Sequence, residues 1–550
     1  MKKFPLYDTE YFDTIPAYLE GLSRKYGNRE AISYFTRKQE KITVTYEELV
    51  LRVTYLKEEL IAMGMAGRHI AIVSENSCDW VVACLAIMAC GAVAVCVDIE
   101  QSDDSIREMI QMADAEMVFA SAGYRSVFDP VSVDQLGLKQ VVYLGAQREG
   151  TKSLDELCEK GKRRTEEQQS GFVTVQPDQP AVIAFTSGTT SKSKLVILSH
   201  KNILKNMCDS CLYVTFEETV FCSLPFYHTY GLTCSILGSL LRGTHVYING
   251  DLKTMLRDLK LAKPDTMLTV PLIVESIYNQ IWLNAEKAGK ADQLKRLLKL
   301  VRVLRKCGIR MKSKTLDGIR EQIAGNLHIM ICGGAHLGKE ISEDFESFGI
   351  LILQGYGITE CSPLISVNSN RSYKMGSVGY VLPSCEIRIV EDEIWVRGDS
   401  VMEGYYKAPE QTKEVMEDGW FKTGDLGYQD KDGCLYLTGR KKNLIVFKNG
   451  KKTSPEKLEE LIMQVPLVKE VVVTGTASGT SVDDVKITAS IYPDPDRTGH
   501  MSSYEILEEL QKEIDAINEK LPTYQQVQMI NIREKEFSKT GTKKIKRHMV

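Results

Sequence analysis

Short apolar runs rich in β-branched residues alternate with amphipathic stretches along the chain before Gly376. The runs that predict strands lie at 69–73, 93–97, 181–185, 245–248, 266–270 and 328–331. The apolar spacing at 46–63 and 294–305 predicts helices. Strands that are apolar on both faces and separated by helices are typical of parallel sheets. We therefore expect the α/β class, with parallel sheets in a large N-terminal part.

After Gly376 the pattern changes to short strands and turns, predicted at 386–390, 393–397 and 434–438. Asp-Gly pairs between these strands are turn signals. This part predicts a β-rich subdomain that completes the large N-terminal domain.

From about Asn443 onward the chain again mixes strands with helices. The predicted strands are 470–474 and 485–492, and the predicted helices are 455–465 and 503–521. This is enough chain for a small α+β domain of ordinary size.

One apolar run, residues 80–97, has no charged residue and approaches the length of a membrane span. Gly91 interrupts it, small residues dominate its first half, and its second half is β-branched and ends at Asp98. A buried helix followed by a parallel strand explains this pattern. We expect no transmembrane span, and a peripheral membrane contact stays open.

Composition excludes some classes of partner and compartment. A length of 550 residues with 43% hydrophobic residues is enough for two or more domains. The net charge of −4 argues against a nucleic-acid partner. The 14 cysteines, without a recognisable signal peptide, favour reduced thiols and a cytoplasmic location. Cys208 and Cys211 form one CxxC pair, which we interpret as two helix-borne thiols rather than zinc ligands.

The most informative local pattern is residues 186–194 (TSGTTSKSK), which lie between two apolar runs. Its hydroxyls, the backbone freedom of Gly188 and the charge of Lys194 suit a loop that holds phosphates. A P-loop would need Gly-Lys-Ser/Thr at a fixed distance after Gly188, and this segment lacks it. The pattern therefore predicts a different kind of phosphate loop.

Five further strings follow in order along the chain. They are 224–231 (LPFYHTYG), 354–360 (QGYGITE), 419–425 (GWFKTGD), 439–443 (GRKKN) and 538–547 (SKTGTKKIKR). Together with the loop, this set resembles the acyl-adenylate-forming, AMP-binding superfamily of acyl-CoA synthetases, luciferases and peptide-synthetase adenylation domains. The resemblance covers almost the whole chain.

The resemblance implies an ATP- and Mg²⁺-dependent reaction in two steps. A carboxylate attacks the α-phosphate of ATP and releases pyrophosphate, and a thiol then displaces AMP. It also implies a large domain, 1–441, and a small mobile domain, 442–550, with the hinge near Lys442. The thiol substrate would be CoA, or the arm of a separate acyl carrier protein.

Site residues follow from the same resemblance. The loop residues that would hold pyrophosphate are Thr186, Ser187, Gly188, Thr189, Thr190 and Lys194. Thr359 would hold the α-phosphate, and Glu360 would bind Mg²⁺, which accepts one or two carboxylates with phosphate oxygens. A surface carboxylate is the alternative interpretation of Glu360.

The nucleoside would be held by two groups of residues. Tyr356 would stack on adenine next to Gly357, and the backbone of Gly333, Gly334 and Ala335 would form a ledge on the other side. Asp425 would accept both ribose hydroxyls and Arg440 would donate to the same ribose. As an alternative, Asp425 is a turn residue.

Lys544 resembles the catalytic lysine of the superfamily, which acts during adenylation only. A shift of one residue in the alignment would transfer this role to Lys543. His228 is assigned to the catalytic set, with an ordinary core or gate histidine as the alternative. In a second pose the loop 448–453 would approach the path of the thiol.

The chain departs from the superfamily pattern in the phosphate loop, where Ser191, Ser193 and Leu195 replace two glycines and a proline. A modest loss of turnover is expected from the looser turn. These departures motivate a rival hypothesis, a nucleotide-binding pseudoenzyme.

The acid substrate is constrained by charge. Residues 226–233 offer no carboxylate to pair an ammonium group, so an α-amino acid is not expected. The segments 269–278 and 294–318 are similar to the long-chain fatty acyl-CoA synthetase branch, although Leu272 stands where an arginine is common. The prediction is a fatty acid ligase that makes acyl-CoA, with a carrier-protein ligase and an aryl or short-chain acid ligase as alternatives.

Overall fold

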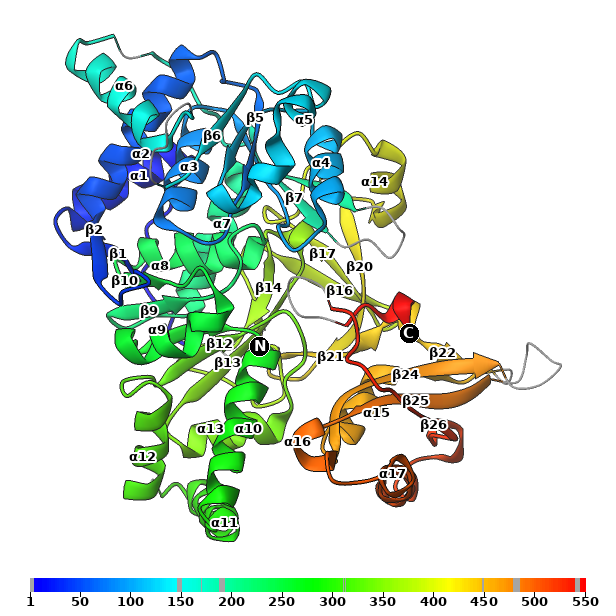
Figure 1. Ribbon diagram of the computed structural model, residues 1–550. Helices are drawn as coiled ribbons and strands as arrows, with labels where there is room; N and C mark the ends of the chain where they lie inside the picture. The colour runs from blue at the N-terminus through cyan, green and yellow to red at the C-terminus, as the bar shows by residue number, and fades with distance from the viewer. Residues whose placement is uncertain are drawn as a thin grey trace. The chain divides into compact units, whose positions relative to one another are not determined.

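The computed structural model describes residues 4–145, 151–169, 171–186, 193–309, 311, 313–447, 450–477, 485–539 and 545–550 (Figure 1). By internal contacts the chain divides into two units. The large unit comprises Met1–Ile387, Val396–Phe421 and Lys431–Cys434, and the small unit comprises Arg388–Trp395, Lys422–Asp430 and Leu435–Val550.

The large unit contains a seven-stranded sheet. Its order is β18 (Gly404–Tyr405), β8 (Lys194–Ser199), β7 (Pro180–Thr186), β4 (Val93–Cys96), β3 (His69–Val73), β5 (Ala115–Ala120) and β6 (Gln140–Tyr143). The five strands from β7 to β6 are parallel, and β8 and β18 add antiparallel edges. Apolar residues of these strands pack against α4 (Asp103–Met112).

A nine-stranded sheet is the second sheet of the large unit. Its order is β15 (Tyr380–Val381), β14 (Leu364–Val367), β13 (Leu351–Gly357), β12 (Ile329–Cys332), β11 (Thr266–Thr269), β9 (Thr219–Cys222), β10 (His245–Ile248), β1 (Glu30–Phe35) and β2 (Lys41–Thr45). The strands from β13 to β1 are parallel. The predicted parallel sheets are therefore confirmed.

Helices cover these sheets (Figure 1). One apolar cluster joins the nine-stranded sheet to α9 (Met255–Ala262), α10 (Pro271–Lys287), α11 (Ala291–Lys306), α12 (Lys314–Ile323) and α13 (Lys339–Ser347). The other helices of the large unit are α1 (Ile15–Tyr26), α2 (Tyr46–Ala62), α3 (Cys78–Ala89), α5 (Pro130–Gln135), α6 (Leu154–Glu166), α7 (His200–Tyr213), α8 (Gly238–Leu241) and α14 (Pro409–Val415).

The uncharged run 80–97 forms α3 and β4, as predicted. All residues of α3 except Asp79 are buried, and β4 pairs in parallel with β3 and β7. The run is apolar because both elements are covered on every side. Among the described residues, no helix is long and apolar enough to cross a membrane.

Short strands follow in a five-stranded sheet. It has the order β16 (Glu386–Val390), β17 (Glu393–Arg397), β20 (Trp420–Gln429) and β19 (Met416–Glu417), with β21 (Leu435–Arg440) beside β20. The rest of the small unit consists of β22 (Ile445–Val446), β23 (Lys452–Thr453), α15 (Pro455–Ile462), β24 (Val468–Ala477), β25 (Val485–Pro493), α16 (Pro495–Thr498), α17 (Ser503–Asn518) and β26 (Met529–Ile532). Its core joins α15 and α17 to β24 and β25.

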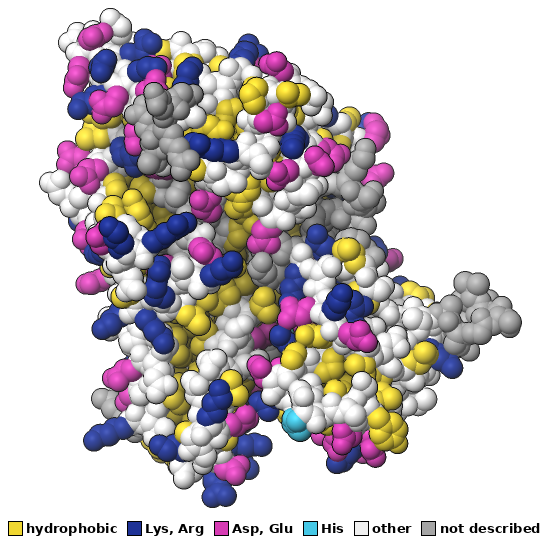
Figure 2. Space-filling model, in the orientation of Figure 1, with side chains coloured by type: hydrophobic (Ala, Val, Ile, Leu, Met, Phe, Trp, Pro, Cys, Tyr) yellow, Lys and Arg dark blue, Asp and Glu magenta, His cyan; other side chains and the backbone are white. Residues whose placement is uncertain are grey.

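The distribution of charged side chains and the burial of the cysteines agree with the expectations from composition. On the face shown in Figure 2, basic and acidic side chains are interspersed, in keeping with the net charge of −4. Cys307 is exposed and the other thirteen cysteines are buried. Cys208 and Cys211 both lie on α7, as predicted.

Burial of His200 at the start of α7 predicts an acid-sensitive fold. The Nδ1 atom of His200 accepts a hydrogen bond from the backbone N–H of Ile15 at 3.3 Å, so protonation of Nδ1 would break this bond. Burial lowers the pKa of His200 from 6.5 to about 4. The unfolded chain binds this proton first as pH falls. The free energy of unfolding should therefore lose about 3 kcal/mol between pH 6.5 and pH 4 through this group. Urea unfolding of wild type and His200→Gln across that range checks this; equal pH slopes would contradict it.

Candidate functional site

Thr359 and Glu360 lie where the parallel part of the nine-stranded sheet ends. β13 ends at Gly357, and a 3₁₀ turn, Thr359–Cys361, follows. A Cβ on Gly357 would come within 2.2 Å of the Pro363 carbonyl oxygen, so only glycine allows this close return of the chain. Ligands of open α/β sheets bind at the carboxyl ends of the strands, and both side chains are half-buried at such an end.

Asn206 on α7 fixes the chain that follows Glu360. The side chain is fully buried, and its Nδ2 donates to the carbonyl oxygens of Cys361 at 3.1 Å and Leu364 at 2.7 Å. Its Oδ1 accepts the N–H of Leu364 at 3.1 Å. A buried amide with both ends satisfied holds the turn rigidly against α7.

Tyr405 connects Glu360 to Lys194. The Tyr405 hydroxyl donates to Glu360 Oε1 at 2.8 Å, and Lys194 Nζ lies 4.6 Å from the centroid of the Tyr405 ring. Burial, together with the charge of Glu360 and the hydrogen bond to it, raises the pKa of Tyr405 well above its ordinary value, so the hydroxyl stays a donor. Antiparallel pairing of β18 with β8 sets this position, with Tyr405 opposite Val196. The cluster brings a carboxylate, a hydroxyl and a cation together.

Replacing Tyr405 by phenylalanine should raise the Mg²⁺ concentration needed for half-maximal pyrophosphate release by about tenfold, because a hydrogen bond to a charged group contributes about 1.5 kcal/mol. Tyr406→Phe is the matched control, since its hydroxyl donates at 2.6 Å to Asp114 instead. Calorimetric titration with ATP, with and without Mg²⁺, separates metal binding from turnover. Equal Mg²⁺ dependence in both variants would contradict the role of Tyr405.

The ends of the predicted phosphate loop are defined by the hairpin of β7 and β8. Thr186 and Lys194 face each other as the last pair of this hairpin. The predicted residues Ser187, Gly188, Thr189 and Thr190 lie outside the described residues. The hairpin therefore brings both ends of the loop together, and Lys194 at one end lies beside Tyr405.

The predicted nucleoside residues of the large unit lie at the carboxyl ends of two neighbouring strands. Tyr356 lies near the end of β13 and is 6% exposed. Gly333 follows β12 and is buried, whereas Gly334 and Ala335 are exposed. A Cβ on Gly333 would lie 3.3 Å from the ring of Tyr230, which explains the small residue there. These residues share one edge of the sheet; their contact with adenine stays a prediction.

His228 lies between β9 and a π-helix, Tyr230–Leu237. Its half-buried ring has its centroid 4.6 Å from that of Tyr227. Gly231 allows the sharp turn, since a Cβ there would come within 2.0 Å of the Pro225 carbonyl oxygen. Single π turns are frequent at functional sites. The catalytic or gating role of His228 stays a prediction.

In the small unit Asp425 and Arg440 face each other across β20 and β21. Arg440 Nε donates to Asp425 Oδ1 at 2.7 Å, and the Asp425 side chain is 14% exposed against 42% for Arg440. The backbone N–H of Asp425 donates to Thr423 Oγ1 at 3.0 Å. A paired carboxylate and guanidinium offer an acceptor and a donor side by side, as two ribose hydroxyls require.

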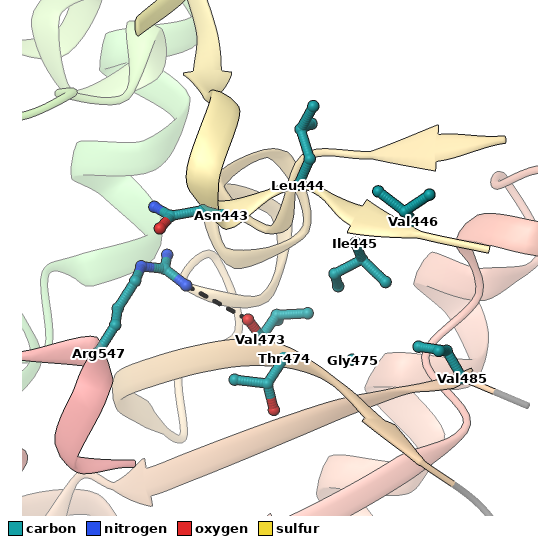
Figure 3. Close-up of a pocket in the computed structure, with 9 residues that line it drawn as sticks. All are labelled: Asn443, Leu444, Ile445, Val446, Val473, Thr474, Gly475, Val485 and Arg547. Atoms are coloured by element: carbon teal, nitrogen blue, oxygen red, sulfur yellow. Dashed lines mark hydrogen bonds between the residues drawn. The ribbon is translucent and has the colours of Figure 1, made fainter. Parts of the chain in front are cut away.

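The predicted hinge residue Lys442 lies in an exposed 3₁₀ turn, Lys441–Asn443. The chain then borders a pocket of about 290 Å³ within the small unit (Figure 3). The pocket is lined by Asn443, Leu444, Ile445, Val446, Val473, Thr474, Gly475, Val485 and Arg547. Arg547 donates to the Val473 carbonyl oxygen at 3.3 Å and pairs with Glu459.

Lys544 and Lys543 lie outside the described residues, as do residues 448 and 449 of the loop 448–453. The chain on both sides of Lys544 is fixed. Lys546 N–H donates to the Ser538 carbonyl oxygen at 2.8 Å, and Lys539 pairs with Glu470. These contacts tie the described residues on either side of positions 540–544 to each other and to β24.

The metal ligands that the described residues offer suit Mg²⁺ better than a metal ion bound by protein side chains alone. Among the described residues, no cluster of three or more His, Cys, Asp and Glu side chains could hold a metal ion. Mg²⁺ is commonly held by one or two carboxylates together with phosphate oxygens and water. Glu360, half-buried at a strand end and oriented by Tyr405, suits that mode.

Comparison with known proteins agrees with this geometry. The family model for AMP-binding enzymes matches residues 19–406, and the model for the AMP-binding enzyme C-terminal domain matches residues 442–550. The long-chain-fatty-acid–CoA ligase FadD15 of Mycobacterium bovis is 30% identical over 455 residues, which cover 79% of this chain and 75% of that protein. A chloroplastic long-chain-fatty-acid–[acyl-carrier-protein] ligase of Arabidopsis thaliana is 27% identical, covering 84% and 74%.

Solved structures share the fold. O-succinylbenzoate coenzyme A synthetase from Bacillus subtilis, in complex with ATP and magnesium ion, has a TM-score of 0.72 at 21% identity and covers 96% of this chain and 98% of that one. A Mycobacterium tuberculosis fatty acyl CoA synthetase has a TM-score of 0.63 at 18% identity, covering 98% and 97%. The predicted fold class and the resemblance are both confirmed. Since the first family model alone spans most of the sequence, the chain belongs to the AMP-binding enzyme family.

Proposed function

We propose that the protein is an ATP-dependent fatty acid ligase that forms acyl-AMP and pyrophosphate and then transfers the acyl group to CoA. The cluster of Glu360, Tyr405 and Lys194 is the observation that carries this proposal. It combines a metal-binding carboxylate with a cation at the end of a phosphate loop. Family membership supports the reaction class, an AMP-forming acid–thiol ligase.

The first step needs charge stabilisation rather than a nucleophilic side chain. As the carboxylate oxygen bonds to the α-phosphorus, the bond to pyrophosphate breaks and negative charge moves onto the leaving group. Lys194 and the hydroxyls of the loop 186–190 would bind that leaving group, and Thr359 would hold the α-phosphate. Mg²⁺ bound at Glu360 would offset part of the triphosphate charge.

The second step breaks the acyl–phosphate bond as the thiolate sulfur bonds to the acyl carbon, and AMP leaves. Lys544 is needed to stabilise charge in the first step only. A small domain that turns about Lys442 would present Lys544 first and the loop 448–453 afterwards. We place the boundary between 441 and 442, and Asp425 and Arg440 would hold the ribose throughout.

A fatty acid suits the site better than an amino acid because residues 226–233 carry no acidic side chain to pair an ammonium group. The names of the fatty-acid–CoA ligase relatives support the same substrate class. CoA is the proposed acceptor, with a carrier protein as the alternative that one relative's name suggests. The fourteen cysteines, thirteen of them buried thiols, support a cytoplasmic location.

Mass spectrometry of products tests this proposal. The protein is incubated with ATP, Mg²⁺ and acids from acetate to oleate, together with benzoate, with and without CoA. Acyl-CoA formed from long acids supports the proposal. Acyl-AMP that accumulates despite CoA would favour a carrier-protein acceptor, and benzoyl-CoA an aryl ligase. No product with any acid, while ATP still binds, would replace the proposal by a nucleotide-binding pseudoenzyme.

A further inference from the structure

The outward face of α11 combines positive charge with exposed apolar side chains. Arg296, Lys299, Leu300 and Val303 are spaced i, i+3, i+4 and i+7, so they form one continuous patch on the helix. Leu300 is 49% exposed and Val303 is 54% exposed. Lys295 and Lys306 flank this patch, and Asp292 is the acidic residue on the same face. We call these seven residues the α11 face.

The opposite side of α11 packs into the hydrophobic core. Leu294, Leu298 and Val301 are buried in the cluster shared with the nine-stranded sheet. Arg302 Nε donates to Asp344 Oδ1 of α13 at 3.0 Å, and Arg305 pairs with Glu346. The arginines that point toward α13 are therefore neutralised by its acids.

The basic residues of the α11 face are not neutralised in this way. Within the described part of the chain, Lys295, Arg296, Lys299 and Lys306 form no ion pair. Lys287, the last residue of α10, and Lys290, just before α11, add two more exposed cations, and Ile309, after α11, is 53% exposed. Figure 2 shows Lys and Arg side chains at the lower end of the large unit, where Figure 1 places α11, with hydrophobic and some acidic side chains among them.

We propose that the α11 face docks the protein on an anionic lipid bilayer. Half-exposed Leu300 and Val303 would enter the boundary between headgroups and acyl chains, and the surrounding cations would contact anionic headgroups. The α11 face is the exposed side of a single helix, with apolar side chains set among cations, and this pattern suits an anionic bilayer. This inference does not depend on the proposed ligase activity.

The strength of such docking can be bounded. A Lys or Arg near an anionic surface contributes about 1 kcal/mol, or about fivefold in partitioning. The α11 face has four basic residues and one acidic residue, Asp292, so its net charge is +3. At about fivefold per charge, the protein should bind anionic vesicles about a hundredfold more strongly than zwitterionic ones. Two apolar side chains give reversible rather than permanent attachment.

Vesicle sedimentation of the full-length protein tests the proposal. Vesicles of phosphatidylcholine alone are compared with vesicles that contain about 30% phosphatidylserine. Wild type should prefer the anionic vesicles by about a hundredfold, and salt of about 0.5 M should abolish the preference. The triple variant Arg296→Gln, Lys299→Gln, Lys306→Gln should lose most of it, and Leu300→Ser with Val303→Ser should weaken binding to anionic vesicles several-fold.

The matched control is Lys457→Gln, Lys520→Gln, Lys535→Gln, which changes the net charge equally at exposed lysines of the small unit. It should retain most of the binding. Circular dichroism melting of every variant shows that the fold is kept. Equal loss in the control triple, or no preference for anionic vesicles in wild type, would overturn the proposal.

Cys307 provides a second readout at the same place. It directly follows α11 and is the exposed one among fourteen cysteines, so a polarity-sensitive fluorophore can be attached there selectively. Anionic vesicles should shift its emission to the blue, and the label should fail to attach to Cys307→Ser. An emission shift with acyl carrier protein but none with vesicles would overturn the proposal in favour of a protein partner.

Discussion

Replacing Lys544 by alanine should lower the rate of pyrophosphate release by at least about a hundredfold, the usual effect of removing one donor that stabilises developing charge. Transfer to CoA from supplied acyl-AMP should change by less than about twofold, because the resemblance assigns this lysine to adenylation only. The two half-reactions are measured separately, by pyrophosphate release and by acyl-CoA formation from synthetic acyl-AMP.

Lys543→Ala is the matched control for this prediction. It removes the same charge one position earlier and should affect both half-reactions only slightly. The opposite result, with a large loss in Lys543→Ala and a small one in Lys544→Ala, would move the catalytic role to Lys543. Equal losses in both half-reactions for Lys544→Ala would contradict a role confined to adenylation.

Replacing Glu360 by glutamine should reduce pyrophosphate release by about a hundredfold or more, because the charge that would hold Mg²⁺ is removed. Glutamine keeps the size of the side chain and an oxygen that can accept the Tyr405 hydroxyl, which donates to Glu360 at 2.8 Å in the wild type. Folding should therefore be preserved. Calorimetry should show that Mg²⁺ no longer strengthens ATP binding in the variant.

Glu403→Gln controls for charge near the site, since Glu403 is an exposed carboxylate next to β18. It should keep the Mg²⁺ dependence of the wild type. If Glu360→Gln retained wild-type Mg²⁺ dependence, Glu360 would be a surface carboxylate and the metal-binding role would be wrong.

Continuous apolar runs predicted the buried strands well. The predicted bounds 69–73 and 245–248 are those of the buried strands β3 and β10, and the short strands predicted at 386–390 and 393–397 match β16 and β17. Strands covered on both faces need apolar residues throughout, which gives an unambiguous pattern. The predicted ends of helices were less accurate: α11 begins three residues before the predicted start at Leu294. Exposed first turns carry no apolar periodicity.

The parts of the site that depend on distant residues could not be predicted. Tyr405 meets Glu360 across 45 positions, and Asn206 reaches Leu364 across 158. Neither residue has a local pattern that distinguishes it from an ordinary tyrosine or asparagine. Only the pairing of β18 with β8 and the packing of α7 bring these side chains to the turn. The roles of the motif residues stay predictions, and the fold shows which distant residues support them.

The most direct test of the central claim uses oleate labelled with ¹⁸O in its carboxylate. If the carboxylate oxygen attacks the α-phosphate of ATP, AMP released during acyl-CoA formation must carry one ¹⁸O atom, which mass spectrometry detects. We predict that label in AMP and none in pyrophosphate. Acyl-CoA formed with label in inorganic phosphate, or with unlabelled AMP, would contradict an acyl-adenylate intermediate.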